Sequence, residues 1–213
     1  MVSRLQRKAR EAAIEAKQLG QYQLEDKLGE GGMGVVYRGK HAMLRRPTAI
    51  KLINHDKVTE RSIQNFEREV QITSQLNHPN TVAVYDYGRT PEGVFYYAME
   101  YLDGIELNDL VEEYGPLEPA RIIYIVSQIC DSLYEAHTHG LVHRDIKPAN
   151  IMINWRGGKS DVVKVLDFGL VLARGDHQNS KRLAGTPLYM SPESIQAPTS
   201  VNACSDILSL IHI

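Results

Sequence analysis

The residues whose types and spacing could do chemistry fall into two groups. Gly29, Gly31 and Gly34 form a GxGxxG pattern, and a backbone without side chains can approach phosphate oxygens closely. Lys51 follows on an expected strand, where its ammonium could pair with the same phosphates. Further along, residues 143–150 read HRDIKPAN, which gathers carboxylate, ammonium and amide groups in one short segment. The first chemistry to consider is therefore the handling of a phosphorylated ligand.

The glycine pattern alone has three interpretations. Dinucleotide-binding folds use the same spacing, but their glycines lead into a helix, and an acid follows about 20 residues later. Here residues 35–37 are Val-Val-Tyr, typical of a strand, and residues 49–51 are Ala-Ile-Lys. A glycine loop between two strands, which covers phosphates, fits this context better. An ordinary glycine hairpin is the remaining alternative.

Lys51 requires a partner if it lies inside a cleft, because a buried and unpaired ammonium is costly. Glu69 lies beside the apolar stripe of an expected helix, whereas Glu67 lies about 200° around that helix from it. Glu69 is therefore the expected partner. Solvated positions for both side chains are the alternative, since Lys and Glu are mostly exposed.

Hydrophobic spacing indicates the elements that must position these groups. Residues 1–20 favour a helical leader that ends at Gly20. The following residues, to Met99, favour short antiparallel strands with one helix between residues 59 and 77, because their connections are short. The strands are expected at residues 35–37, 48–53, 82–87 and 94–99, with Tyr22, Leu24 and Leu28 on one face of another.

The second half of the chain is predicted to be mainly helical. Residues 119–139 give the clearest helix, with Pro119 in its first turn and Gly140 after its end. Its expected buried stripe consists of Ile122, Val126, Ile129, Leu133 and Ala136.

Composition excludes several classes of protein. The formal net charge is −2 and 43% of the 213 residues are hydrophobic, which is typical of a globular protein and gives no electrostatic argument for nucleic acid binding. Cys130 and Cys204 are isolated, so a reducing compartment is expected. No apolar run approaches the roughly 18 residues of a membrane span, and no signal peptide is evident, so we expect a cytoplasmic chain without a span.

In order along the chain, the motifs resemble the signature set of protein kinases from Tyr22 to Asp206. Residues 145–150 (DIKPAN) and 185–189 (GTPLY) resemble the serine/threonine branch, and the GEGGMG loop is similar to that of bacterial eukaryotic-like members. The resemblance implies an α+β, two-lobed protein kinase-like fold. The implied limits are a leader at 1–20 and a kinase domain at 22–213, with a small lobe at 22–99, a hinge at 100–104 and a shortened large lobe at 105–213.

The resemblance also implies roles for the polar residues. Asp145 would accept the proton of a substrate hydroxyl, and Lys147 would steady the transferring phosphoryl group. Asn150 and Asp167 would hold Mg²⁺, because amide and carboxylate oxygens are its preferred ligands. Lys51, paired with Glu69, would position the α and β phosphates of ATP.

The implied nucleotide site extends along the glycine loop and the hinge. Met99 would line the back of the adenine pocket or simply pack in the core, Glu100 and Leu102 would offer backbone hydrogen bonds to the base, and Met152 would form the floor. The full set is Leu28, Gly29, Glu30, Gly31, Gly32, Met33, Gly34, Val35, Val36, Ala49, Lys51, Glu69, Met99, Glu100, Leu102 and Met152.

Regulation and substrates follow from the same resemblance. Arg144 suggests pairing with a phosphate on the activation segment, where Ser180 is the only Ser or Thr between Gly169 and Gly185. ATP and proteins that carry serine or threonine are the implied partners, and the oligomeric state stays open.

The resemblance weakens at the end of the chain. Leu208 and Ile211 replace an expected aromatic residue and an expected glycine, and the further helices of the family are missing. Two functions therefore stay open: an active serine/threonine kinase, or an incomplete kinase-like module that binds nucleotide or a partner and transfers phosphate poorly.

Overall fold

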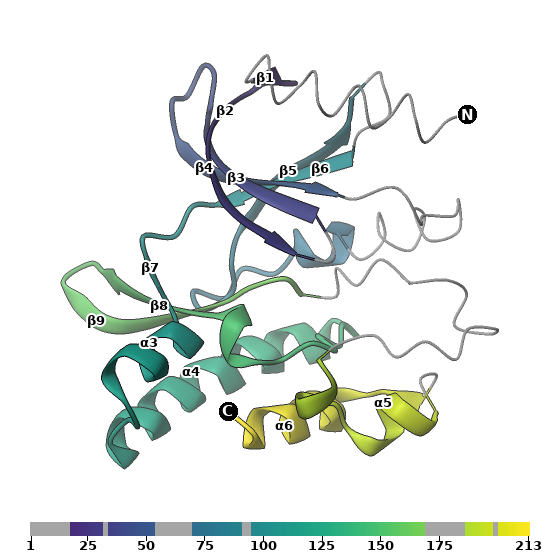
Figure 1. Cartoon of the computed structure of the whole chain (residues 1–213). Coiled ribbons are helices and arrows are strands. Elements are labelled where there is room, and N and C mark those ends of the chain that lie inside the picture. Colours follow the sequence, from purple (N-terminus) through teal and green to yellow (C-terminus); the bar gives the residue numbers. More distant parts are fainter. Residues whose placement is uncertain (1–17, 32–33, 54–69, 91–94, 169–185, 198–199) are drawn as a thin grey trace. The chain divides into compact units, whose positions relative to one another are not determined.

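The computed structural model describes residues 18–31, 34–53, 70–90, 95–168, 186–197 and 200–213. The chain forms two compact units, one made of residues 1–59 and 83–101 and the other of residues 60–82 and 102–213. The elements in chain order (Figure 1) are β1 (Gln18–Leu19), β2 (Tyr22–Gly31), β3 (Gly34–His41), β4 (Pro47–Ile53), β5 (Val84–Arg89), β6 (Phe95–Glu100), β7 (Gly104–Glu106), α3 (Leu107–Tyr114), α4 (Pro119–Thr138), η1 (Pro148–Asn150), β8 (Ile151–Arg156), β9 (Lys159–Val165), η2 (Pro187–Tyr189), α5 (Pro192–Gln196) and α6 (Ala203–Ile211).

The first unit is built on one antiparallel sheet with the strand order β1-β2-β3-β4-β6-β5. The expected antiparallel strands are confirmed, and most of their ends differ by a residue or two. The strand expected at 35–37 is five residues longer, since β3 spans Gly34–His41. In β4, Ile50 and Leu52 are fully buried, and Ala98 of β6 packs in the same cluster. Every residue of β4 after Pro47 is buried, so this strand runs through the centre of the unit.

The expected face of β2 is correct for Tyr22 and Leu24, which are buried, and wrong for Leu28, which is 49% exposed. The pairing of β2 with β3 shifts register between Leu24 and Lys27 and again between Lys27 and Gly29. A bulge breaks the alternation of side chains between the two faces of a strand. Residues beyond the bulge therefore no longer follow the spacing that the sequence suggests.

The helical leader is wrong at its end. Gln18 and Leu19 form the short strand β1, which pairs with Gln23 and Tyr22 across a turn at Gly20. Leu19 is 1% exposed and packs in the core of the first unit. Burial of this leucine favours the strand over the local helix preference. Residues 1–17 lie outside the described residues.

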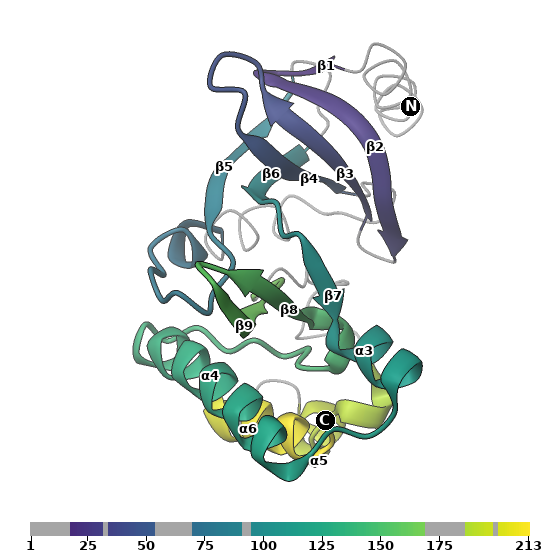
Figure 2. The same ribbon diagram turned by 90° about the vertical axis from the view of Figure 1, so that its left-hand side faces the viewer.

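The second unit combines a three-stranded sheet, β7-β8-β9, with α4 and the shorter helices (Figure 2). Its core joins the sheet, through Ile151 and Val165, to α4, through Ile129 and Leu133. The expected helix at 59–77 is described only from residue 70, and residues 70–73 are helical. Among the described residues, no helix combines the length and hydropathy needed to cross a membrane.

The range of α4 is confirmed, but part of its expected stripe is wrong. Ile122 is 44% exposed, and Ile125 is buried in its place. The face that meets β9 includes Arg121, which pairs with the Asp161 carboxylate, and Gln128, whose side chain bonds the backbone of Asp161 and Val163. Polar residues on the buried face set the rotation of this helix, and hydrophobic periodicity cannot detect them.

Candidate active site

A buried histidine anchors the loop that follows α4. His143 has no exposed surface, and its Nε2 donates to the carbonyl oxygen of Leu166 at 2.7 Å. Its ring centroid lies 4.9 Å from that of Phe168, which is also fully buried. His143 therefore has a structural role in this loop. The two contacts fasten the loop to the segment that carries Asp167.

A second anchor of the loop is the carboxylate of Asp206, in the first turn of α6. It accepts hydrogen bonds from the backbone N–H groups of His143 and Arg144, each at 2.8 Å, and lies 2.8 Å from Nε2 of His137. Burial acts to raise the pKa of Asp206, but the His137 contact and the two backbone donors outweigh it, so the pKa lies below the ordinary value. Arg144 has a φ of 68°, a strained conformation that these bonds stabilise.

Asp145 lies at the centre of a small polar network in the second unit. Its carboxylate lies 2.8 Å from Nζ of Lys147, and it accepts hydrogen bonds from the backbone N–H of Thr186 at 3.3 Å and from the Thr186 hydroxyl at 3.4 Å. Nζ of Lys147 also donates to the Thr186 hydroxyl at 3.1 Å. The network connects Thr186 to the loop that carries Asp145. It holds an acceptor carboxylate beside an ammonium.

Asn150 joins the same network through its amide nitrogen. Nδ2 donates to the backbone carbonyl of Asp145 at 2.7 Å and to its carboxylate at 3.2 Å. This leaves the amide oxygen, the atom that Mg²⁺ prefers. The Leu166 N–H donates to the carbonyl oxygen of Asn150 at 2.9 Å, which ties Asn150 to the strand end next to Asp167. The donor set of Asn150 and Asp167 therefore fits a magnesium ion.

The first unit places the other expected residues on its sheet. Lys51 is buried on β4 opposite Val36, and its Nζ lies 5.7 Å from the centre of the Tyr97 ring. Gly31 pairs with Gly34 where β2 turns into β3, so the glycine loop connects two strands and not a strand and a helix. The dinucleotide-binding interpretation of the glycines is therefore excluded. Ala49 is buried, as is Val35, and pairs with Met99.

The glycines differ in the space around them. A Cβ on Gly34 would collide with the backbone carbonyl oxygen of Leu52, whereas a Cβ on Gly29 or Gly31 would meet nothing within 4 Å. Gly34 is therefore needed for the packing of the strands. Gly29 and Gly31 leave the backbone open to a ligand, and Leu28 and Glu30 beside them are exposed.

The structure shows where the residues expected at the adenine base lie. Met99 is 7% exposed, so its side chain packs in the sheet. The N–H of Glu100 donates to the Ala83 carbonyl at 2.9 Å, so this N–H is already used within the first unit. Leu102 and Met152 are partly exposed and belong to the second unit.

The structure thus brings together Asp145, Lys147 and Asn150, and it connects Asn150 to the segment of Asp167. Lys51 lies in the first unit. Gly32, Met33, Glu69 and Ser180 lie outside the described residues, so the pairing of Lys51 with Glu69 and the phosphorylation of Ser180 stay predictions.

Sequence reasoning missed the anchoring roles of Asp206 and His137. Their side chains meet although 69 positions separate them in the chain. No local pattern in the sequence indicates this contact, because its two partners lie on different helices, α4 and α6.

Comparison with known proteins places these features in a family. The protein kinase domain profile matches residues 22–212. The serine/threonine-protein kinase PknB of Mycolicibacterium smegmatis is 43% identical over 197 residues, and pkn3 of Myxococcus xanthus is 40% identical over 179. These matches cover 89% and 81% of this chain but only 31% and 33% of the relatives, so the chain spans about a third of their length.

Solved structures agree. The kinase domain of Mycobacterium tuberculosis PknI matches with a TM-score of 0.70 and 26% identity, covering 91% of this chain and 71% of that one. The expected α+β, two-lobed fold is confirmed, as is the resemblance to bacterial serine/threonine kinases. The chain belongs to the protein kinase domain family.

Proposed function

We propose that this chain transfers the γ-phosphoryl group of ATP to serine and threonine hydroxyls of proteins, including its own. The observation that carries the proposal is the network in which Lys147, Thr186 and Asn150 converge on the Asp145 carboxylate. Similarity to the family does not by itself show that the catalytic side chains are present, because a related protein can lack them. Here the polar groups are present, and hydrogen bonds hold them in place.

Each group of the network has a proposed task. The Asp145 carboxylate accepts the proton of the attacking hydroxyl, and general-base catalysis of this kind contributes about 10²- to 10⁴-fold in rate. The Lys147 ammonium stabilises charge on the transferring group. Thr186 fixes the carboxylate through two bonds, one from its N–H and one from its hydroxyl, so that the oxygen needs no reorganisation when substrate arrives.

The metal is assigned to residues of the second unit, and the phosphate groups of the nucleotide are assigned to residues of the first. We assign the amide oxygen of Asn150 and the carboxylate of Asp167 to Mg²⁺, which supplies neutralisation of phosphate charge when bound. Lys51 is assigned to the phosphates, with Glu69 as its partner. The open backbone at Gly29 and Gly31 is assigned to the phosphate groups as well.

The remaining assignments concern the domain limits, the phosphorylation site and the cellular location. The domain limits given above, phosphorylation at Ser180 with Arg144 as its partner, and a cytoplasmic location belong to the proposal. Cys130 and Cys204 form no disulfide, which supports a reducing compartment.

A second candidate function is a nucleotide-binding module with little transfer. It is favoured by α6, where Ile207 and Ile211 are 43% and 73% exposed although the helix carries Asp206. An anchor with exposed apolar side chains could hold the loop less firmly. This candidate predicts ATP binding without product.

The test is incubation of the chain with Mg²⁺ and γ-labelled ATP, followed by identification of the labelled amino acids. We expect label on serine and threonine, none on tyrosine, and none after chelation of the metal. ATP binding without label would favour the second candidate. Absence of both would overturn the nucleotide site itself.

A further inference from the structure

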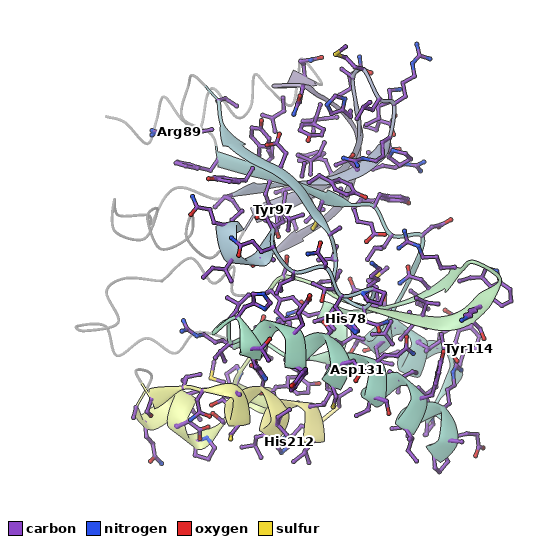
Figure 3. All side chains as sticks on the ribbon, turned by 180° about the vertical axis from the view of Figure 1, so that it is seen from behind. His78, Arg89, Tyr97, Tyr114, Asp131 and His212 are labelled. Atoms are coloured by element: carbon purple, nitrogen blue, oxygen red, sulfur yellow. The ribbon has the colours of Figure 1, made fainter. Side chains whose placement is uncertain are left out.

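Lys51 has an aromatic neighbour to which the proposed transfer assigns no task. On β6, Tyr97 lies directly opposite Lys51 in the antiparallel ladder with β4. Residues that lie directly opposite each other in such a ladder project from the same face of the sheet. Figure 3 labels Tyr97 on the sheet of the first unit. The register of two central strands therefore places the tyrosine ring beside the lysine side chain.

The same register continues on both sides of this pair. Val36 of β3 lies opposite Lys51 on its other side, and Tyr87 of β5 lies opposite Tyr97. The four residues form a row across one face of the sheet, in the order Val36, Lys51, Tyr97 and Tyr87. Neighbours on both sides therefore limit where the two central side chains can go.

Both side chains of the pair are shielded from water. Lys51 is 6% exposed and Tyr97 is 1% exposed. Nζ of Lys51 lies over the Tyr97 ring, 5.7 Å from its centre. An ammonium within about 6 Å of the ring centre is attracted by the electron density of the ring face, and the attraction is strongest for desolvated pairs. The ring therefore stabilises the buried ammonium in addition to the expected pairing with Glu69.

The position of the ammonium matters because a lysine side chain is flexible. Fixing its long stem when a ligand binds costs side-chain entropy. A contact that restricts the ammonium before the ligand arrives lowers this cost and so strengthens binding. We propose that Tyr97 is a positioning residue for Lys51, whose ring holds the ammonium where it meets the phosphates of ATP. This inference rests on the proposed function, since that function assigns the phosphates to Lys51.

The positioning role has a kinetic signature. Lys51 would contact the phosphates both before and during transfer, so a loss of its orientation should raise the KM for ATP more than it lowers kcat. Tyr97→Leu removes the ring and should weaken MgATP binding about 10-fold, which corresponds to about 1.4 kcal/mol. Its kcat should stay within about 3-fold of the wild type. Tyr97→Phe keeps the ring and should bind MgATP within about 3-fold of the wild type.

Fluorination of the ring separates its electrostatic effect from its shape. Each fluorine withdraws electron density from the ring face and weakens its attraction for a cation, with little change in size. We therefore expect the dissociation constant for MgATP to rise stepwise as the new ring in Tyr97→Phe carries one, two and then three fluorines. Titration calorimetry of the full chain with MgATP measures this series, and thermal unfolding of each variant is measured beside it.

Tyr96 provides the matched control. It precedes Tyr97 on β6 and projects from the opposite face of the sheet, where its ring centroid lies 6.1 Å from that of Tyr22. It is also buried, with 9% of its surface exposed. Tyr96→Leu makes the same change in the same strand, so it should lower the unfolding temperature without weakening MgATP binding. Fluorination of the ring in Tyr96→Phe should leave MgATP binding unchanged.

An unchanged dissociation constant across the fluorine series at Tyr97, or equal weakening of MgATP binding by Tyr96→Leu, would overturn the positioning role. Tighter binding by Tyr97→Leu would also overturn it, because the ring would then hold the ammonium away from the phosphates. A stepwise response of MgATP binding in a chain that shows no transfer would overturn the proposed function and leave the role of Tyr97. Transfer by a chain whose MgATP binding is insensitive to the ring would do the opposite.

Discussion

At the scale of single residues, the site depends on the few hydrogen-bond donors that orient the Asp145 carboxylate. Thr186 supplies two of them, its N–H and its hydroxyl, and Lys147 supplies the charged one. When fixed donors hold a carboxylate, the oxygen that accepts the proton points in one direction. The orientation of Asp145 is therefore as important to the account as its presence.

Replacement of Thr186 tests that orientation. Thr186→Val keeps the shape but removes the hydroxyl that bonds Asp145 and Lys147, so we expect turnover to fall about 10- to 100-fold. Thr186→Ser keeps a hydroxyl and should retain most of the rate. Steady-state kinetics with matched thermal unfolding would check this. Equal turnover in the valine and wild-type proteins would show that the hydroxyl does not position the base.

The residues that do chemistry were predictable because they are local in sequence. Asp145, Lys147 and Asn150 lie within one short motif, and their contacts follow from the tight turn of η1. His137 and Asp206 were not, because their contact joins a helix end to a distant helix start. Pairings of that kind depend on packing of the whole unit.

At the scale of elements, the glycine loop combines two different requirements. Gly34 has no room for a Cβ because the Leu52 carbonyl lies against it, whereas Gly31 has open space. Gly34 is therefore required for the packing of the sheet. Gly31 leaves the backbone accessible to a ligand.

Two matched substitutions separate these requirements. Gly34→Ala should lower the free energy of unfolding by about 2 kcal/mol or more, since the strand must shift. Gly31→Ala should leave the unfolding temperature nearly unchanged but weaken ATP binding, because the new methyl group would take up open space beside the backbone that is assigned to the phosphates. Calorimetry of unfolding and nucleotide titration measure the two effects. Unimpaired ATP binding by Gly31→Ala would contradict the assignment of this loop.

Elements were predicted well where burial follows hydrophobic spacing and poorly elsewhere. The range of α4 was correct, but its rotation depends on Arg121 and Gln128, which bond the β9 segment, and on Ser132, which bonds Thr81. Polar residues with buried partners leave no mark in a hydrophobic pattern. The hydrophobic pattern does not reveal the bulges in β2 either, so the exposure of Leu28 was not predictable.

At the scale of the whole molecule, α6 connects separate parts of the second unit. Asp206 bonds the loop and His137, and the Ser205 hydroxyl donates to the Glu193 carboxylate of α5 at 2.5 Å. The hydroxyl of Ser209 donates to the Tyr189 carbonyl at 2.6 Å. One helix turn thus links the base-bearing loop with the segment that follows Thr186.

The acid dependence of stability follows from Asp206. Its pKa is lowered in the folded chain, so its stabilising contribution is fully present above the unfolded value of about 3.9 and is lost as the pH falls through the lower folded value. Asp206→Asn should cost about 2–4 kcal/mol at neutral pH, because it breaks a buried hydrogen-bonded network. The difference should shrink as the pH falls below the unfolded value and through the lower folded one.

Denaturant unfolding of both proteins across this pH range is the measurement. His137→Gln provides a comparison, since it removes one partner of Asp206 and keeps the two backbone bonds, so its cost should be smaller. A constant difference between wild type and Asp206→Asn from neutral to acid pH would contradict the role given to this carboxylate.

The central claim is tested most directly by measuring MgATP binding and phosphoryl transfer in one variant, Asp145→Asn. The account predicts binding within about 3-fold of the wild type and transfer reduced by at least about 10²-fold, because the asparagine keeps the shape of the network but cannot accept the proton. Transfer at the wild-type rate in Asp145→Asn would contradict it.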